Sequence, residues 1–199
     1  MSSFNQLSLD NLNKFLASAT AVVPYKEAAD GTAPPGSVAM RHDVDHDIEK
    51  ALQFAEWEHH YGYRSTYFLL HSANYYTNNP GFDSAILYLR ELGHEIGLHN
   101  DALCACDGNL GDAIITIQNE LSFLRNFYPV VGIADHGGSP HTNGDIWNSY
   151  TPAQFTLEYE AYQLQKTANT YISDNQGTWR APLKHAQTFM LIHPIWWPV

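Results

Sequence analysis

Hydrophobic and polar positions along this chain of 199 residues follow two alternating patterns. Apolar residues three and four apart, the mark of one helix face, recur at 9–16, 48–62, 82–92 and 110–124. Short apolar or β-branched runs, typical of buried strands, lie at 37–42, 65–70, 94–99 and 130–135, with weaker ones at 170–173 and 190–193. A stretch rich in Gly and Pro at 28–36 predicts a loop.

The regular alternation of strand and helix predicts an α/β fold with a parallel sheet and covering helices. Sequential parallel strands can close into a barrel or stay open. Eight complete strand–helix units take about 250 residues, more than the 199 of this chain. We therefore expect a distorted or incomplete (β/α) barrel, as a single domain over residues 1–199.

Composition narrows the classes of partner. The formal charge of −11 argues against nucleic-acid binding, which requires a basic surface. Five Trp and twelve Tyr suit the stacking platforms of a sugar-binding cleft, although packing explains most such rings equally well. Residues 1–6 lack the pattern of a secretory signal and no apolar run reaches membrane-spanning length, so we expect a cytoplasmic location.

The two cysteines, Cys104 and Cys106, are one residue apart. A disulfide at that spacing is strained and rare, which favours two reduced thiols. A metal clip is the alternative, since His99 lies close by in the sequence.

The candidate catalytic and metal-binding residues lie where predicted strands end. Asp43 and Asp45 follow the strand at 37–42 and, two apart, point to the same side of an extended chain. The carboxyl ends of parallel strands face one crevice, where a cation would relieve the repulsion between two carboxylates. One would then bind the metal and the other act as general base, unless both are surface acids and Asp45 caps the helix that follows.

Three histidines also follow strands of this polarity: His99, His136 and His193. A neutral imidazole at such a position is a good zinc ligand, although a single histidine is more often structural. His94, at the start of its strand, should lie at the opposite end of the sheet and is interpreted as structural. The remaining candidates lack a strand-end position and are expected to be solvated or structural: His42, His46, His59, His60, His71 and His185.

Three motifs carry a resemblance to a known family. They are Arg-His-Asp-Val-Asp at 41–45, Ser-Thr-Tyr-Phe at 65–68 and Gly-His-Glu-Ile-Gly-Leu-His at 93–99. In this order and spacing they resemble the polysaccharide deacetylase superfamily, carbohydrate esterase family four, with its NodB-homology domain. The closing segment at 191–197 resembles a subgroup associated with surface-polysaccharide gene clusters. The resemblance spans about residues 38–197.

The resemblance implies a distorted, incomplete (β/α) barrel and a role for each matching residue. Asp43 matches the catalytic base and Asp45 the metal-binding aspartate. His99 matches the first histidine ligand, and His193 the histidine that protonates the leaving amine. Asp174, together with Trp179, resembles the pair that orients that histidine, and the Arg-Ala-Pro at 180–182 resembles a further family motif in an unusual place.

One departure concerns the metal. The second metal-binding histidine of the family lies four residues after the first, where this chain has Leu103. His136 is our candidate replacement because it ends a neighbouring strand, with Asp101 and His141 as weaker alternatives. Asp45 and His99 alone would bind metal poorly, because catalytic zinc usually keeps three protein ligands.

These observations predict a metal-dependent hydrolase, most simply a zinc enzyme, that removes an acyl group from a sugar or glycan precursor. The acyl group expected is N-acetyl. The alternatives are a catalytically silent glycan-binding module on the same fold and an amidohydrolase acting on a non-sugar substrate. Function depends on the site rather than on the fold, so the side-chain geometry decides among them.

Overall fold

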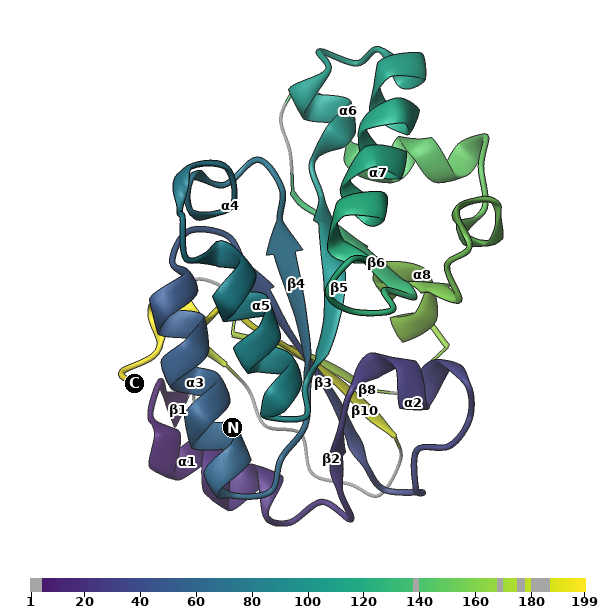
Figure 1. The fold of residues 1–199 in the computed structure, drawn as a ribbon. Coiled ribbons are helices and arrows are strands. Elements are labelled where there is room, and N and C mark those ends of the chain that lie inside the picture. Colours follow the sequence, from purple (N-terminus) through teal and green to yellow (C-terminus); the bar gives the residue numbers. More distant parts are fainter. Residues whose placement is uncertain (1–4, 138–139, 168–169, 175–177, 180–186) are drawn as a thin grey trace.

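An eight-stranded parallel sheet forms the centre of the computed structural model, which describes residues 5–137, 140–167, 170–174, 178–179 and 187–199 (Figure 1). The strand order is β7-β6-β5-β4-β3-β10-β8, with β2 beside the first residues of β3. The sheet curls, and no pairing joins β7 to β8 in the described part of the chain. The barrel is therefore incomplete, as expected. Its strands are β2 (Val22–Val23), β3 (Val38–Val44), β4 (Thr66–Leu70), β5 (Glu95–Asn100), β6 (Gly132–Asp135), β7 (Tyr159–Glu160), β8 (Thr170–Ser173) and β10 (Thr188–Ile192).

Helices connect the strands and cover the outer face of the sheet, where α3 and α5 lie side by side (Figure 1). They are α1 (Leu9–Leu16), α2 (Tyr25–Ala29), α3 (Ile48–His60), α4 (Asn74–Asn78), α5 (Phe82–Glu91), α6 (Ala102–Ala105), α7 (Leu110–Leu124) and α8 (Ala161–Gln165). Short 3₁₀ turns are η1 (Asn143–Asn148), η2 (Pro152–Phe155) and η4 (Pro194–Trp196). A separate antiparallel pair joins β1 (Asn5–Gln6) to β9 (Thr178–Trp179).

The predicted helices and strands are confirmed, and local signals explain their ends. Asp47 caps α3 by accepting the amide of Lys50, so Asp45, the cap that the sequence left open, is not used in that way. Asn109 caps α7 in the same manner. Gly93 follows α5 with a φ of 91°, a conformation that favours glycine.

The sequence pattern missed the shortest elements. The expected loop at 28–36 overlaps the end of α2, and the two-residue strands β2 and β7 carry too few positions for a period to show. None of the helices described combines the length and apolarity needed to cross a bilayer.

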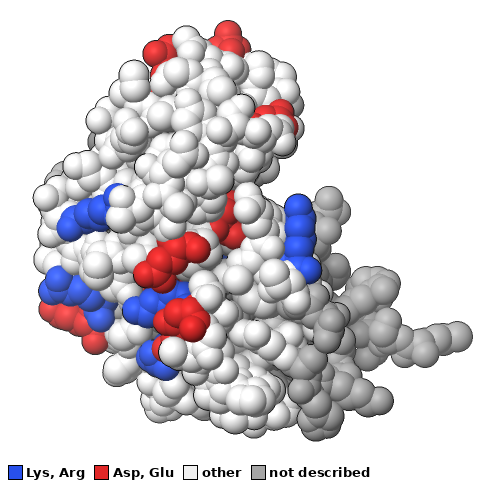
Figure 2. Space-filling view, turned by 90° about the vertical axis from the view of Figure 1, so that its right-hand side faces the viewer, with Lys and Arg blue, Asp and Glu red and all other residues white. Residues whose placement is uncertain are grey.

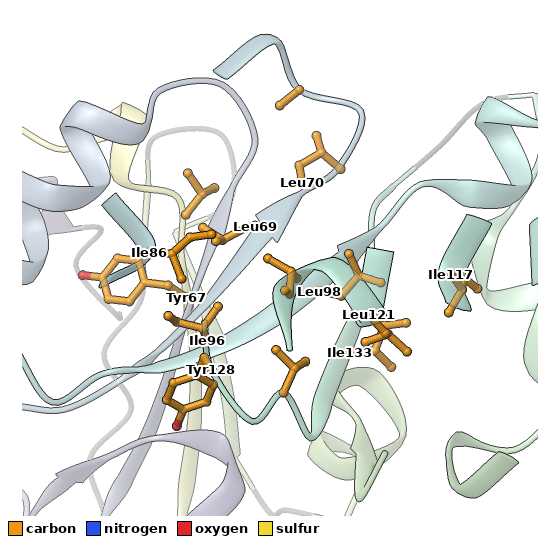
Figure 3. Close-up of a cluster of buried hydrophobic side chains, with 14 of the residues drawn as sticks. Tyr67, Leu69, Leu70, Ile86, Ile96, Leu98, Ile117, Leu121, Tyr128 and Ile133 are labelled. Atoms are coloured by element: carbon orange, nitrogen blue, oxygen red, sulfur yellow. The ribbon is translucent and has the colours of Figure 1, made fainter. Parts of the chain in front are cut away.

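Alternation along the strands divides the core into two sides. Tyr67, Ile96 and Ile133 point outward and pack with α5 and α7 in the cluster of Figure 3. Phe68 and Ala134, one residue away, point into the half-barrel with Tyr159. The interior of the half-barrel is therefore a small aromatic core. The carboxyl ends of the strands lie beyond this core and form the site.

Candidate active site

Strand β3 delivers two carboxylates to the carboxyl end of the half-barrel. Asp43 lies on the interior side of the strand and is 2% exposed, while Asp45 directly follows the strand and is partly exposed. Their Oδ1 atoms are both buried, and neither accepts a hydrogen bond of regular geometry from the residues that the structure describes. Buried, unpaired carboxylate oxygens are costly, so this pair has the chemistry of a site that awaits a cation or a proton donor.

His99, near the end of β5, faces both carboxylates. Its Nε2 lies 3.2 Å from Asp45 Oδ1 and 3.7 Å from Asp43 Oδ2. Its Nδ1 lies 2.9 Å from the carbonyl oxygen of Ala134 and therefore donates to it. When neutral, the ring has its lone pair on Nε2, on the side of the two aspartates, which is the tautomer that a metal ligand needs. Burial lowers the pKa of His99, but Asp43 and Asp45 outweigh it and the net pKa is raised, so without a cation between them the ring favours its charged form.

His193, directly after β10, approaches from the opposite side. Its Nε2 lies 3.9 Å from Asp45 Oδ2, and its Nδ1 lies 2.8 Å from Asp174 Oδ1. The other oxygen of Asp174 accepts from the backbone amide of His193 and from the indole of Trp197. Asp174, fully buried, is thus held by three donors and fixes the orientation of the imidazole.

Arg41 is an interior residue whose role the sequence pattern missed. Its guanidinium is fully buried, with Nη2 3.3 Å from Asp43 Oδ2, and it lies 4.4 Å from the centroid of the Tyr162 ring. The signal was available in the sequence, because Arg41 and Asp43 are two apart on one strand and so share a face.

His136 follows β6, and its ring meets that of His99 edge to face, with 5.3 Å between centroids. Its Nδ1 lies 3.3 Å from Asp101 Oδ1, an oxygen that also accepts from the amide of Asn143. Leu103, where the resemblance calls for a histidine, is buried in the apolar core. His141 lies elsewhere, with its Nε2 3.4 Å from the exposed carboxylate of Asp107.

The acidic and basic groups of the site stabilise each other's ionised forms. Burial raises the pKa of Asp45, but the neighbouring His99 outweighs it and the net pKa is lowered. Burial lowers the pKa of His193, yet Asp174 reverses the effect and leaves the net pKa raised. The site therefore favours an ionised Asp45 beside a protonated His193.

The residues meet part of the requirement for a metal. The 3.2 Å between Asp45 Oδ1 and His99 Nε2 matches the separation of about 3.3 Å between two ligands that each lie 2.0–2.1 Å from a tetrahedral ion. Within the described residues, however, no group of three His, Cys, Asp or Glu side chains is placed to hold an ion. Two ligands fit, and the described residues do not place a third beside them; His136 as the third ligand stays a prediction.

The structure also corrects the position assigned to one histidine, His71, and places His42 and His94 in structural contacts, as expected. His71 directly follows β4 and so has the strand-end position that we had denied it; its buried Nε2 accepts the backbone amide of Asp101. Burial lowers its pKa to about 4. His42 points to the outer face, where its Nε2 lies 2.7 Å from the buried carboxylate of Glu58. His94 lies at the far end of β5, as expected, with its Nδ1 3.6 Å from Glu58.

The remaining expectations concern residues away from the site. Cys104 and Cys106 are free, as expected. The motif at 180–182 and His185 lie outside the described residues, as does the side chain of Trp179.

Comparison with known proteins supports the fold. No protein-family model and no curated protein matches the sequence. A mutant of the peptidoglycan deacetylase PdaC from Bacillus subtilis superposes with a TM-score of 0.52 at 14% identity, over 79% of this chain and 74% of that one. Two further structures have TM-scores too low to carry an argument. A family 4 carbohydrate esterase from Bacillus anthracis gives 0.44 at 10% identity over 98% and 83% of the two chains. A pseudoenzyme of the same family and organism gives 0.46 at 13% identity over 79% and 54%.

The curled parallel sheet and its likeness to PdaC agree with the motifs at 41–45, 65–68 and 93–99. Membership of the surface-polysaccharide subgroup stays a prediction. The chain has the same distorted, half-open (β/α) barrel fold as the peptidoglycan deacetylase PdaC.

Proposed function

We propose that this chain is a hydrolase that removes an acyl group, in the simplest case N-acetyl, from a sugar or glycan precursor. The observation that carries the proposal is the meeting of four side chains at one strand-end site. Asp43 and Asp45 lie 3.7 and 3.2 Å from His99 Nε2, and Asp45 lies 3.9 Å from His193 Nε2. An acid and a base on opposite sides of a reacting carbonyl are what amide hydrolysis requires.

In this proposal, Asp43 takes a proton from a water molecule as the water oxygen forms a bond to the acyl carbon. His193, protonated, gives its proton to the nitrogen as the carbon–nitrogen bond breaks, so that a carboxylic acid and an amine leave. The acid then ionises in water, Asp43 releases its proton to the solvent, and His193 takes up a new one. Asp174 acts through His193 by holding its ring and favouring its charged form. General acid–base assistance of this kind contributes about 10²–10⁴-fold each.

Dependence on a divalent cation belongs to the proposal, with Asp45 and His99 as the residues that would hold it. Zinc is the first ion to test, because the two donors are a carboxylate oxygen and an imidazole nitrogen. When bound, such an ion would polarise the acyl carbonyl.

The test is acetate release from an oligosaccharide of N-acetylglucosamine, with and without added zinc. We expect turnover by the natural chain, a loss of at least about 10²-fold in Asp43→Asn, and no change in Asp83→Asn, a matched change at an exposed position of α5. Equal rates in Asp43→Asn and the natural chain would overturn the assigned mechanism.

A second candidate is a glycan-binding module without turnover. Leu103 favours it, because this side chain is packed into the apolar core where the family motif has a metal-binding histidine. Saturable binding of the oligosaccharide without acetate release at any metal concentration would select this alternative. Release of an acyl group from a non-sugar amide alone would instead select the third possibility, an amidohydrolase.

A further inference from the structure

A cavity of about 660 Å³ opens beside the candidate site, between the end of β6, the turn η1 and the helix α8. This volume lies in the range of about 300–1,000 Å³ that small-molecule sites occupy. Figure 2 views this side of the molecule, whose surface is hollowed, with acidic and basic side chains near the hollow. None of the chemistry proposed above uses the cavity.

Two contacts join the cavity to the proposed catalytic groups. His136 lines it, and the ring of this residue meets that of His99. Tyr162 also lines it, 4.4 Å from the guanidinium of Arg41, which pairs in turn with Asp43. A ligand in the cavity would therefore lie one side chain away from the acyl group under attack.

The walls combine an aromatic ring with hydrogen-bonding groups. Trp147 is held rigidly, because its indole nitrogen donates to Asp135 at 2.6 Å and its ring packs edge to face on Phe155. A fixed, half-buried indole beside polar side chains is a suitable surface for a sugar ring, which has one apolar face and many hydroxyls.

The charges of the walls are mostly acidic. Asp135 and Glu160 are both buried, while Lys166 at the edge of the cavity is exposed. Because both carboxyl groups line the same cavity, they repel each other when both are ionised. A third negative charge would add to this repulsion, whereas a neutral or cationic group would not.

We propose that this cavity binds the sugar next to the acylated one, and that it selects glycans that are neutral or cationic there over glycans with a carboxylate or phosphate. The inference rests on the proposed function and names its substrate class. Trp147 provides the platform, and the buried carboxyl groups of Asp135 and Glu160 provide discrimination by charge.

The test measures binding to Asp43→Asn, so that hydrolysis does not consume the ligand. The probes are a trisaccharide of N-acetylglucosamine, its fully deacetylated and cationic form, and a hyaluronan oligosaccharide that carries glucuronate carboxylates. We expect the first two to bind at least about tenfold more tightly than the third at pH 7.5. Equal or tighter binding of the hyaluronan probe would overturn the proposal.

Two further variants test the walls in the same background. Trp147→Ala should weaken binding of the neutral trisaccharide about tenfold. Lys166→Glu changes an exposed side chain without disturbing the core, and it should widen the preference for the cationic over the anionic probe by severalfold. Lys14→Glu makes the same charge change at an exposed position of α1, outside the cavity, and should not alter the preference.

The outcomes separate this inference from the proposed function. If the natural chain releases acetate but neither cavity variant changes binding, the subsite is wrong and the hydrolase stands. If no acetate is released but binding depends on Trp147 and Lys166, the subsite stands in a binding module.

Discussion

The three histidines near the site differ in the group that faces their Nδ1 atom. His99 donates to a neutral carbonyl, that of Ala134, whereas His193 faces the buried carboxylate of Asp174. A carbonyl acceptor orients a neutral ring, while a carboxylate also stabilises the imidazolium. His99 is therefore suited to bind a cation and His193 to give up a proton. His136, paired with Asp101, resembles His193 more than His99 in this respect.

A prediction follows for Asp174→Asn. The amide still accepts hydrogen bonds from the backbone and from Trp197, but the charge that stabilises the His193 imidazolium is gone. We expect the pKa of His193 to fall, as followed by NMR titration of its ring, and acetate release at neutral pH to drop about 10²-fold or more. Asp83→Asn is the matched control; an unchanged pKa of His193 would contradict the assigned role.

At the scale of elements, two glycines permit close approach inside the half-barrel. A Cβ on Gly97 of β5 would lie 2.4 Å from ring atoms of Phe68, and one on Gly132 of β6 would lie 2.2 Å from the Tyr159 ring. Because strands alternate their faces, both glycines point into the aromatic interior. They make room for the rings that fill the half-barrel below Asp43 and His99.

Gly97→Ala should therefore displace Phe68 and lower the free energy of unfolding by about 1–3 kcal/mol. The matched change is Gly111→Ala in α7, where the new Cβ would lie 3.4 Å from the side chain of Asn109, an ordinary contact. That variant should be neutral or more stable by up to about 1 kcal/mol, because alanine is the better helix former. Urea denaturation measures both; equal effects of the two variants would contradict the packing argument.

The whole molecule carries a formal charge of −11 and buries several acids that differ in what surrounds them. Burial raises the pKa of Glu58, but His42 outweighs it and the net pKa is lowered. Glu160 has no histidine at hydrogen-bond distance among the described residues, and burial raises its pKa to about 7. Glu58 therefore adds stability above the pKa of an ordinary Glu, whereas Glu160 has the opposite dependence on pH. The treatment of residues 1–199 as one domain stays a prediction at this scale.

Glu160 makes the pH dependence of stability testable. Its folded-state pKa of about 7 exceeds the ordinary value of 4.5, so the folded state holds the proton longer than the unfolded state. The contribution of Glu160 to the free energy of unfolding should therefore fall as the pH rises from about 4.5 to 7, by up to about 3 kcal/mol. In Glu160→Gln this fall should disappear from urea-denaturation data over that range; an unchanged pH profile would contradict the assignment.

Local patterns alone determined the order of the elements and the strand ends at which Asp43, Asp45, His99 and His193 lie. They could do so because hydrophobic periodicity and the polarity of parallel strands are properties of neighbouring residues. Contacts between distant segments decided the rest: the position of the Tyr162 ring against Arg41, the hydrogen bond that His71 accepts from the backbone amide of Asp101, and the cavity between η1 and α8. Side-chain partners in a curled sheet depend on packing across the barrel, which no local pattern records.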